Sequence, residues 1–406
     1  MIHADEARGL ILQKVRPLGT EEILLSDSLG RFLFQAVTAP VSLPTFDNSA
    51  MDGFAIRSEE TRSASQANPA AFKVIGTIAA GDGPGKIGPG EACRIMTGAI
   101  VPEGADAVVP FEDAVDEKER CLITEPIPEG DNIRYAGEDI RKGNAILAPG
   151  ERINSRTIAL LAALGLTRVS VFKRPRVRIL STGSELARTG EPLRLGQIYN
   201  SNGPALAAAL KEIGIESPEI TVAADTEAEL KQAISRINPS DDCDALITIG
   251  AVSAGDFDLV PKVLKDLGAE IIFHKVAIKP GKPLLYATKP PLQIFGLPGN
   301  PVSALMVFDR FVRPALLKMM GAREVFRATK SALASEDLKG SSGKEDYLRG
   351  IVEYRDGHYV ARSAGSQGSA RLVPLAKANA VLVIPADRKS IAKGETVTFE
   401  FLSGAA

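Results

Sequence analysis

The sequence predicts a multidomain protein of the α/β plus β class, and three observations lead to this prediction. Its 406 residues are too many for one hydrophobic core, which favours two to four domains. Between residues 174 and 327, short apolar runs alternate with helical patterns, and this alternation is typical of a doubly wound sheet of parallel strands. Before and after that stretch, glycine, proline and short β-prone runs predict β-rich parts.

The N-terminal 44 residues are too few to form a core of their own. A helical pattern covers 4–15, and a second short helix is expected over 27–37. We expect this segment to pair with 149–173, where Ser155 can cap a further helix. The first domain, 1–44 with 149–173, is therefore predicted to be discontinuous in sequence.

Two β-rich parts complete the predicted organisation. Residues 45–148 interrupt the first domain and form a β-rich insert, while 328–406 form a small C-terminal β-barrel. Within the second part, Asp356-Gly357 lies between two alternating apolar runs, which predicts a tight β-hairpin.

Polar, glycine-rich segments follow the strands predicted for 174–327. These strands are expected over 177–180, 219–224, 245–249 and 293–295. The candidate site residues that follow them are Ser181, Gly183, Glu185, Asp225, Ser253, Asp258, Pro298, Asn300 and Pro301. Because ligands of open α/β sheets bind outside the carboxyl ends of the strands, we interpret these loops as one binding pocket.

Three of these residues are acidic oxygen donors, namely Glu185, Asp225 and Asp258. Carboxylates beside an anion site favour a hard cation such as Mg²⁺. Asp225 and Asp258 also precede predicted helices, so helix capping is an alternative role for both.

The same stretch is rich in lysine where the backbone is broken by glycine and proline. Lys275, Lys279 and Lys282 lie within KVAIKPGKP, and Asn300-Pro301 then begins an apolar helix. A helix start offers free backbone N–H groups, so lysines beside it predict a site for an oxyanion or phosphate. The alternative is an ordinary loop with solvated lysines.

Composition argues against several other classes. The net charge of -2 gives no sign of nucleic-acid binding, and no apolar run is long enough to span a bilayer. The absence of a signal-peptide pattern leads us to expect a cytoplasmic protein. Three scattered cysteines and three scattered histidines support no disulfide framework, thiolate metal site or Ser/His/Asp triad. No GxGxxG follows a strand, which disfavours a dinucleotide enzyme.

Taken in order, eight strings in this chain resemble one family, the molybdopterin molybdenumtransferases, to which the gephyrin E domain also belongs. The strings are PTFDNSAMDGFAI, RIMTGAIVPEGADAVV, GEDIRKG, STGSEL, GQIYNSN, VSAGDFD, KVAIKPGKP and FGLPGNPVSA. The resemblance covers essentially the whole chain. It implies four domains, with 174–327 as a three-layer α/β/α molybdopterin-binding domain.

The resemblance also implies an activity and partners. Family members use Mg²⁺ to insert molybdate into adenylated molybdopterin, with release of AMP. They form homodimers whose active site lies between the α/β domain of one subunit and the β insert of the other. Other proteins of molybdenum cofactor biosynthesis would be further partners, whereas nucleic acid and membrane would not.

Carried over by position, the resemblance assigns roles to residues outside the strand-end loops as well. Molybdate or substrate phosphates would be held by Lys275, Lys279, Ser303, Arg349 and Ser369. Mg²⁺ binding or pterin orientation would fall to Glu185, Asp225 and Asp258. The partner subunit would contribute Asp52, Thr97 and Asp139. For Arg349, a cross-strand ion pair with Glu353 or Asp346 is the alternative.

The chain departs from the family pattern at two of these loops. Ser184 stands where the family usually has Asp, and Ala251 where it usually has a second Gly. Two other functions are weighed against molybdate insertion. One is a molybdopterin adenylyltransferase-like activity, which would make the adenylated substrate from ATP and free molybdopterin. The other is a non-catalytic scaffold of the same fold.

Overall fold

The computed structural model describes residues 1–216, 218–237, 243–252 and 259–402. The chain divides into two compact units, each described by itself below. The first unit contains residues 1–35, 149–154 and 169–406, and the second contains 36–148 and 155–168. Both units are built from discontinuous stretches. The four-domain division of the sequence stays a prediction.

A six-stranded sheet forms the centre of the first unit. Its strands, in spatial order, are β16 (Glu219–Ala223), β13 (Val177–Thr182), β17 (Ala245–Ile249), β21 (Leu292–Leu297), β20 (Leu285–Lys289) and β18 (Glu270–His274). The first four are mutually parallel. This is the doubly wound core that the alternating pattern predicts.

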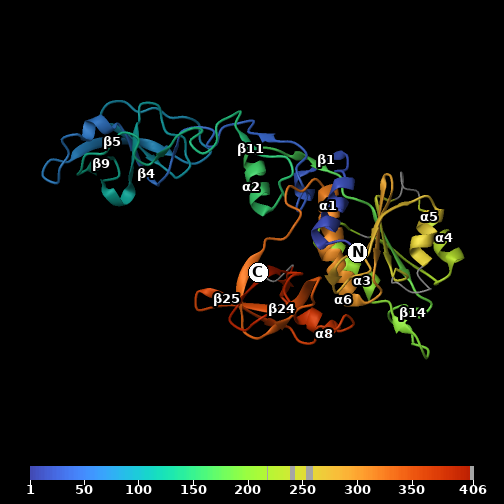
Figure 1. The fold of residues 1–406 in the computed structure, drawn as a ribbon. Helices are drawn as coiled ribbons and strands as arrows, with labels where there is room; N and C mark the ends of the chain where they lie inside the picture. The colour runs from blue at the N-terminus through green and yellow to red at the C-terminus, as the bar shows by residue number, and fades with distance from the viewer. Residues whose placement is uncertain (217, 238–242, 253–258, 403–406) are drawn as a thin grey trace. The chain divides into compact units, whose positions relative to one another are not determined.

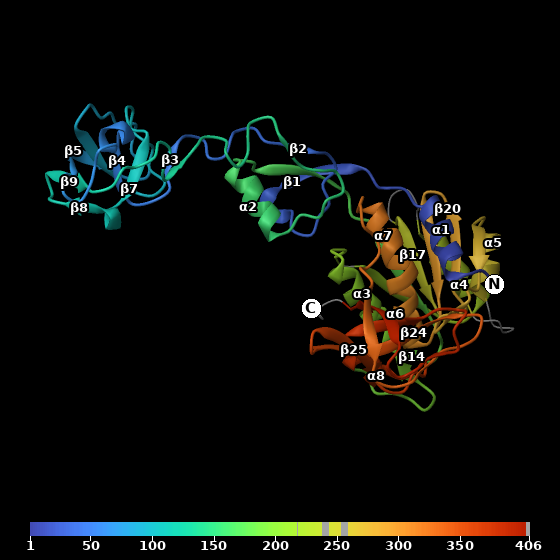
Figure 2. The same ribbon diagram turned by 60° about the vertical axis from the view of Figure 1, so that its left-hand side comes forward.

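Helices cover both faces of this sheet, giving the expected three layers (Figure 1). The helices are α3 (Asn202–Glu212), α4 (Glu227–Ser235), α5 (Leu259–Asp266) and α6 (Pro301–Val307). Successive strand residues point to opposite faces, so Ile179 packs in the core with α3 and α6, and Leu180 in the core with α4 and α5. Figure 2 shows the same layers from a second direction.

One strand runs against the others, so the sheet is mixed and the prediction of a wholly parallel sheet is wrong. β20 pairs antiparallel with both β21 and β18. Only Pro290 and Pro291 separate β20 from β21. A two-residue connection can join antiparallel neighbours, but it is far too short for a parallel crossover.

The apolar helix that the sequence predicts from Pro301 onward exists, but it changes geometry in the middle. α6 leads into the π-helical segment η4 (Phe308–Val312) and then into α7 (Arg313–Met319). The N-terminal helix α1 (Ala4–Lys14) packs against this long helix, and Ala7 and Ile11 are buried there. Among the described residues, no helix is long and apolar enough to cross a membrane.

The second helix expected over 27–37 is wrong. The structure has a short 3₁₀ turn, η1 (Leu25–Asp27), followed by Gly30 at φ +77°. Phe32 and Leu33 then form bridges with Arg152 and Val171, so tertiary pairing overrides the local helical pattern. Nearby, β1 (Thr20–Leu24) pairs with β12 (Arg168–Phe172).

The C-terminal part of the first unit is a closed five-stranded barrel, as predicted. Its strands are β22 (Lys330–Ala334), β24 (Glu345–Arg355), β25 (His358–Ser363), β26 (Ala380–Ile384) and β28 (Thr396–Phe401), and the pairing of β24 with β26 closes it. Asp356 and Gly357 have φ of +47° and +83°, as the predicted tight hairpin turn requires. A short helix, α8 (Leu372–Lys377), was not predicted. Smaller pairs are β14 (Leu186–Ala187) with β15 (Ile198–Tyr199), and β23 (Leu338–Lys339) with β27 (Ser390–Ile391).

The second unit is β-rich and contains its own six-stranded sheet. The strands, in spatial order, are β7 (Ala107–Pro110), β4 (Gly53–Ile56), β6 (Glu91–Ile95), β5 (Ala70–Ile78), β9 (Arg120–Ile123) and β8 (Ala114–Asp116). Further elements are β2 (Val37–Thr38), β3 (Asn48–Ser49), η2 (Ser58–Thr61), η3 (Phe111–Asp113), β10 (Ile133–Arg134), β11 (Ala145–Leu147) and helix α2 (Ser155–Ala163). Cys93 and Cys121 are buried here, and burial raises the pKa of the Cys121 thiol to about 12.

Candidate functional site

The four strand-end loops of the first unit lie along one edge of the sheet. β16, β13, β17 and β21 are adjacent and parallel, so their carboxyl ends meet there. The Gly183 N–H donates to the Ala223 carbonyl (3.2 Å), and the Gly250 N–H donates to the Leu297 carbonyl (2.9 Å). The structure therefore brings together the loops that the sequence marks as a pocket.

Glycine is required where these loops approach each other most closely. Gly250 has φ +90°, and a Cβ there would lie 2.7 Å from Thr182 Oγ1. Gly183 has φ +149°, and a Cβ would lie 2.6 Å from Glu185 Oε2, so the Glu185 side chain lies over this glycine. Ala251 adopts φ +50°, a left-handed conformation that favours glycine.

Two of the three predicted carboxylates lie at this edge. Glu185 follows β13 and Asp225 follows β16, and both are exposed. Asp258 and Ser253 lie outside the described residues. Within the described ranges, no group of three or more His, Cys, Asp or Glu side chains is arranged to hold a metal. Mg²⁺ usually keeps several waters and uses one or two carboxylates plus substrate phosphates, so Glu185 and Asp225 are donors of the kind that this ion takes.

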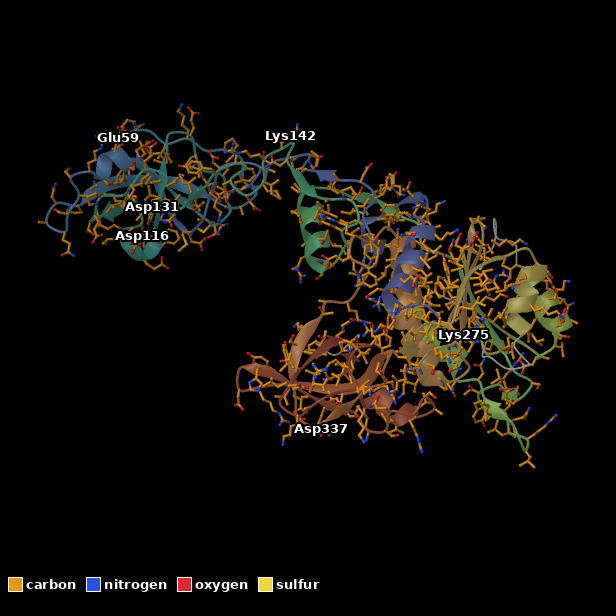
Figure 3. All side chains as sticks on the ribbon, in the orientation of Figure 1. Glu59, Asp116, Asp131, Lys142, Lys275 and Asp337 are labelled. Atoms are coloured by element: carbon orange, nitrogen blue, oxygen red, sulfur yellow. The ribbon has the colours of Figure 1, made fainter. Side chains whose placement is uncertain are left out.

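The antiparallel strand β20 explains how the lysines reach the same edge. Leu285 at the start of β20 pairs with Gly296 near the end of β21, so the loop over 275–284 leaves the sheet where the other loops do. Lys275 is half-buried at φ +78° and is labelled in Figure 3, whereas Lys282 is exposed. The Val276 N–H donates to the Lys282 carbonyl (2.9 Å), which closes the loop.

Lys279 joins the loop to the barrel. It lies on β19 (Ile278–Lys279), which pairs with β24 so that Lys279 is opposite Asp346. The Lys279 ammonium donates to Ser341 Oγ (2.9 Å) and lies 3.9 Å from Asp346 Oδ1. Asp346 is buried, and that burial raises its pKa against the opposing effect of the Ser341 hydrogen bonds.

Arg349 is a buried cation on the same strand. It is 1% exposed, and its Nη2 donates to the carbonyls of Ser366 (3.0 Å) and Gly368 (3.1 Å). Within the described part of the chain it pairs with no carboxylate, and its Nε has no hydrogen-bond partner. The alternative of an ion pair with Glu353 or Asp346 is therefore wrong. Burial lowers the pKa of Arg349, which shows how poorly its charge is solvated.

Lys279 and Arg349 line one cavity of about 520 Å³. Its other charged lining residues are Lys339, Asp337 and Asp346, and Figure 3 labels Asp337. Asp346 is engaged by Ser341, and Asp337 accepts from the Lys393 N–H (2.8 Å). Three cationic residues thus line the cavity with two acids that already accept hydrogen bonds, and the cavity suits a small anion.

The start of α6 is less open than predicted. The Val302 N–H donates to the Ser369 carbonyl (3.2 Å), so one of the free helix-start donors is already used. Asn300 caps the helix without a side-chain hydrogen bond and is exposed, as Pro301 begins the first turn. Ser303 is 4% exposed. Pro298 lies in the loop between β21 and α6. Ser181 is buried and lies within β13.

Three family profiles match the chain in order. They describe the MoeA N-terminal region (domain I and II) over residues 2–165, a probable molybdopterin binding domain over 178–318, and the MoeA C-terminal region (domain IV) over 331–402.

The chain also resembles curated proteins over almost its whole length. The molybdopterin molybdenumtransferase of Haemophilus influenzae is 35% identical over 404 residues, 98% of both chains. That of Bacillus subtilis is 36% identical over 405 residues, 98% of this chain and 93% of the relative. The chain belongs to the molybdopterin molybdenumtransferase family. The crystal structure of a molybdopterin biosynthesis MoeA protein from Pyrococcus horikoshii OT3 covers 99% of it, with a TM-score of 0.85 and 30% identity.

In this molybdopterin molybdenumtransferase family member, three residues that hold parts of the candidate site in place were not predicted from the sequence. Asn200 Nδ2 donates to Ser181 Oγ (3.1 Å), and Asn202 Nδ2 donates to the Gly299 carbonyl (2.7 Å), so both tie strand-end loops together. Gln367 Oε1 accepts from the Arg349 N–H (2.9 Å). The string GQIYNSN could have indicated the two asparagines, whereas no sequence pattern indicated Gln367.

The second unit of this family member carries Asp52, Thr97 and Asp139. Asp52 Oδ1 accepts from both the N–H and the Oγ1 of Thr97, each at 2.7 Å. The Asp139 N–H donates to the Leu43 carbonyl (3.1 Å). Asp52 and Thr97 thus form one exposed pair, and Asp139 lies in a separate turn.

The Asp52–Thr97 pair makes a testable electrostatic prediction. The hydrogen bonds from the Thr97 backbone and side chain lower the pKa of Asp52. The pKa of Asp52 is lower in the folded protein than its ordinary value, so the hydrogen bonds to the ionised carboxylate stabilise the fold at pH values above the ordinary pKa. This stabilisation is lost as the pH falls through the lowered pKa. Thr97→Val removes one donor, so we expect the pKa of Asp52 to rise in a carboxyl NMR titration. Asp116, whose pKa is lowered by Lys118 and Arg94, is the internal control and should not change.

Proposed function

We propose that this protein inserts molybdate into adenylated molybdopterin, releases AMP and so completes the molybdenum cofactor. The observation that carries the proposal is the cavity lined by Lys279 and Arg349. Molybdate is a small tetrahedral dianion, and it needs cationic N–H donors in a partly desolvated place. Arg349 meets that description because it is buried without a carboxylate partner among the described residues.

The remaining residues have matching proposed roles. Lys275 and Lys282 would hold substrate phosphates at the sheet edge, with Ser303 and Ser369 beside the helix start. The strand-end loops at Ser181, Gly183 and Pro298 would enclose the pterin. Glu185 and Asp225 would hold Mg²⁺, which when bound neutralises phosphate charge and supports departure of AMP.

A second copy of the chain is part of the proposal. Asp52, Thr97 and Asp139 belong to the second unit, and in the proposed homodimer this unit would complete the site of the other subunit. The protein would act in the cytoplasm, where its substrates and other proteins of the same biosynthesis would be found.

The direct test is a reaction with purified protein. Adenylated molybdopterin, molybdate and Mg²⁺ are mixed with it, and AMP and molybdenum-loaded cofactor are measured by chromatography. Release of AMP together with cofactor formation supports insertion. Formation of adenylated molybdopterin from ATP and free molybdopterin would instead assign the adenylyltransferase activity. Binding of substrate without either product would favour the scaffold.

The proposed metal role predicts a change in Mg²⁺ dependence. Asp225→Asn keeps the size of the side chain but removes the charge at the end of β16. We expect the Mg²⁺ concentration for half-maximal activity to rise roughly tenfold, because one hard anionic ligand is lost. Glu229→Gln, on the exposed surface of the helix that follows, is the control and should behave as wild type. An unchanged Mg²⁺ requirement in Asp225→Asn would exclude this carboxylate from the metal site.

A further inference from the structure

The strand that carries Arg349 also carries a second group of polar residues, which the proposed chemistry does not use. Glu345, Tyr347 and Arg349 alternate along β24 and therefore share one face. The intervening Leu348 packs in the barrel core, whereas Tyr347 packs in the core of the α/β sheet. β24 is thus the contact between the barrel and the sheet-and-helix part of the first unit.

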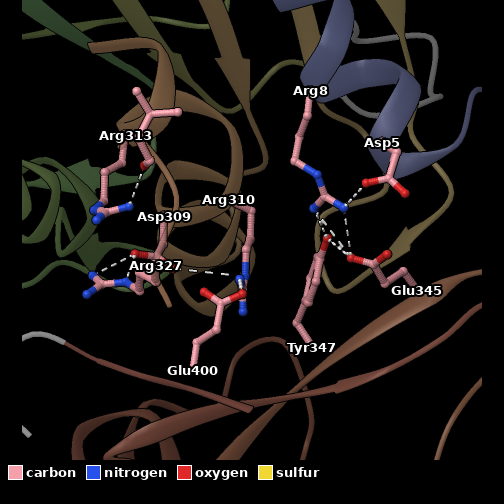
Figure 4. Close-up of polar contacts among 10 residues, drawn as sticks. Asp5, Arg8, Asp309, Arg310, Arg313, Arg327, Glu345, Tyr347 and Glu400 are labelled. Atoms are coloured by element: carbon pink, nitrogen blue, oxygen red, sulfur yellow. Dashed lines mark hydrogen bonds and ion pairs between the residues drawn. The ribbon is translucent and has the colours of Figure 1, made fainter. Parts of the chain in front are cut away.

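Tyr347 is fully buried and held from three directions (Figure 4). Its hydroxyl donates to Glu345 and accepts from Arg8 Nη1 (3.0 Å) on helix α1. The Arg310 guanidinium lies over its ring, 4.8 Å from the centroid. Burial raises the pKa of Tyr347, so the ring stays neutral and its face attracts a cation.

The burial of Arg310 is unusual for a residue with only a structural role. It lies in the π-helical segment η4 and is only 7% exposed. Its Nη1 pairs with Glu400 of the barrel at 2.5 Å, and its Nε lies 3.9 Å from Asp309 Oδ2, but Nε and Nη2 have no hydrogen-bond partner in the described part of the chain. Burying idle N–H groups costs free energy, and π-helical segments are frequent at functional sites.

We propose that Arg310, acting through Tyr347, is a positioning residue for the anion cavity that contains Lys279 and Arg349. The inference rests on the proposed function. Tyr347 itself lines that cavity, and Arg349 follows two residues later on the same rigid strand. Lys279 is paired to the same strand opposite Asp346. Any shift of β24 at Tyr347 therefore moves both cations, and displacements near 1 Å are enough to affect binding of a reacting group.

The test removes the Arg310–Glu400 pair as a unit, so that no buried charge is left alone. In Arg310→Met with Glu400→Gln, the KM for molybdate is expected to rise roughly tenfold, while kcat changes less than about threefold. A purely structural role would lower kcat by reducing the folded fraction and would leave KM unchanged. Such a result would overturn the inference.

Arg327→Lys is the control, because Arg327 pairs with Asp309 at the same junction (2.8 Å) and lysine keeps a positive charge beside that carboxylate. Its KM for molybdate should equal that of wild type, and an equal rise in both variants would contradict a specific role for Arg310. If the double variant does not fold, Arg310→Lys keeps the charge but not the planar stack. It should also raise the KM, and a wild-type value would overturn the inference.

The two proposals fail in different ways. If wild-type protein forms no molybdenum cofactor, the proposed function is wrong and the positioning role falls with it. If wild type is active and the Arg310 variants keep its KM for molybdate, only the positioning role is wrong.

Discussion

Arg349→Met is expected to lower kcat/KM for molybdate roughly 100-fold, the typical cost of removing one preorganised electrostatic donor from an active site. The guanidinium is buried, makes no ion pair among the described residues, and holds its position through the carbonyls of Ser366 and Gly368. Among the described residues that line the cavity, no other arginine supplies a planar, permanently charged donor. The measurement is steady-state kinetics at varied molybdate with saturating adenylated molybdopterin.

The chain offers a matched control on the same strand. Arg355 is exposed and pairs with Glu353, so Arg355→Met should change kcat/KM by less than about twofold. Arg349→Lys keeps the charge but loses the fork geometry, and we expect an intermediate loss. Equal activity in Arg349→Met and Arg355→Met would show that Arg349 does not contact the reacting anion.

Gly281→Ala is expected to have the largest effect on stability, with a decrease of about 2–5 kcal/mol in the free energy of unfolding. Gly281 lies between Lys279 and Lys282 at φ +108°, and a Cβ there would lie 2.5 Å from Val307 Cγ2 and 3.2 Å from Ile278 Cδ1. Val307 is fully buried in the sheet core, so its side chain cannot turn away into solvent. The added methyl must therefore push the lysine loop away from α6.

Gly268→Ala separates backbone strain from this clash. Gly268 also has positive φ, +79°, but a Cβ there meets nothing within 4 Å, so its cost is only the left-handed conformation, about 1–2 kcal/mol. Urea denaturation of both variants gives the comparison. In Gly281→Ala we also expect a lower kcat/KM for molybdate, because Lys279 moves with the loop. Equal destabilisation of the two variants would contradict the close packing of Gly281.

The sequence alone was sufficient for features that depend on short-range patterns. Alternating apolar runs predicted the β/α repeat, and Asp356-Gly357 predicted its turn because both positions need positive φ. The strand-end rule then placed Ser181, Asp225 and Pro298 near one edge, and the adjacent parallel strands confirm that shared edge. The resemblance of ordered strings to one family was confirmed over nearly the entire chain.

Only the tertiary structure decided the features that depend on which distant segments pack together. The direction of β20 brings Lys275 and Lys282 to the edge of the sheet where the strand-end loops lie. Arg349 is held by the carbonyls of Ser366 and Gly368 and has no carboxylate partner among the described residues. The apolar pattern of residues 27–37 is helical, yet Phe32 and Leu33 are stabilised more by pairing with Arg152 and Val171 than by a local helix. The physical reason is that apolar periodicity reports which face of a segment is buried, whereas strand direction, ion pairing and desolvation are set by partners far away in sequence.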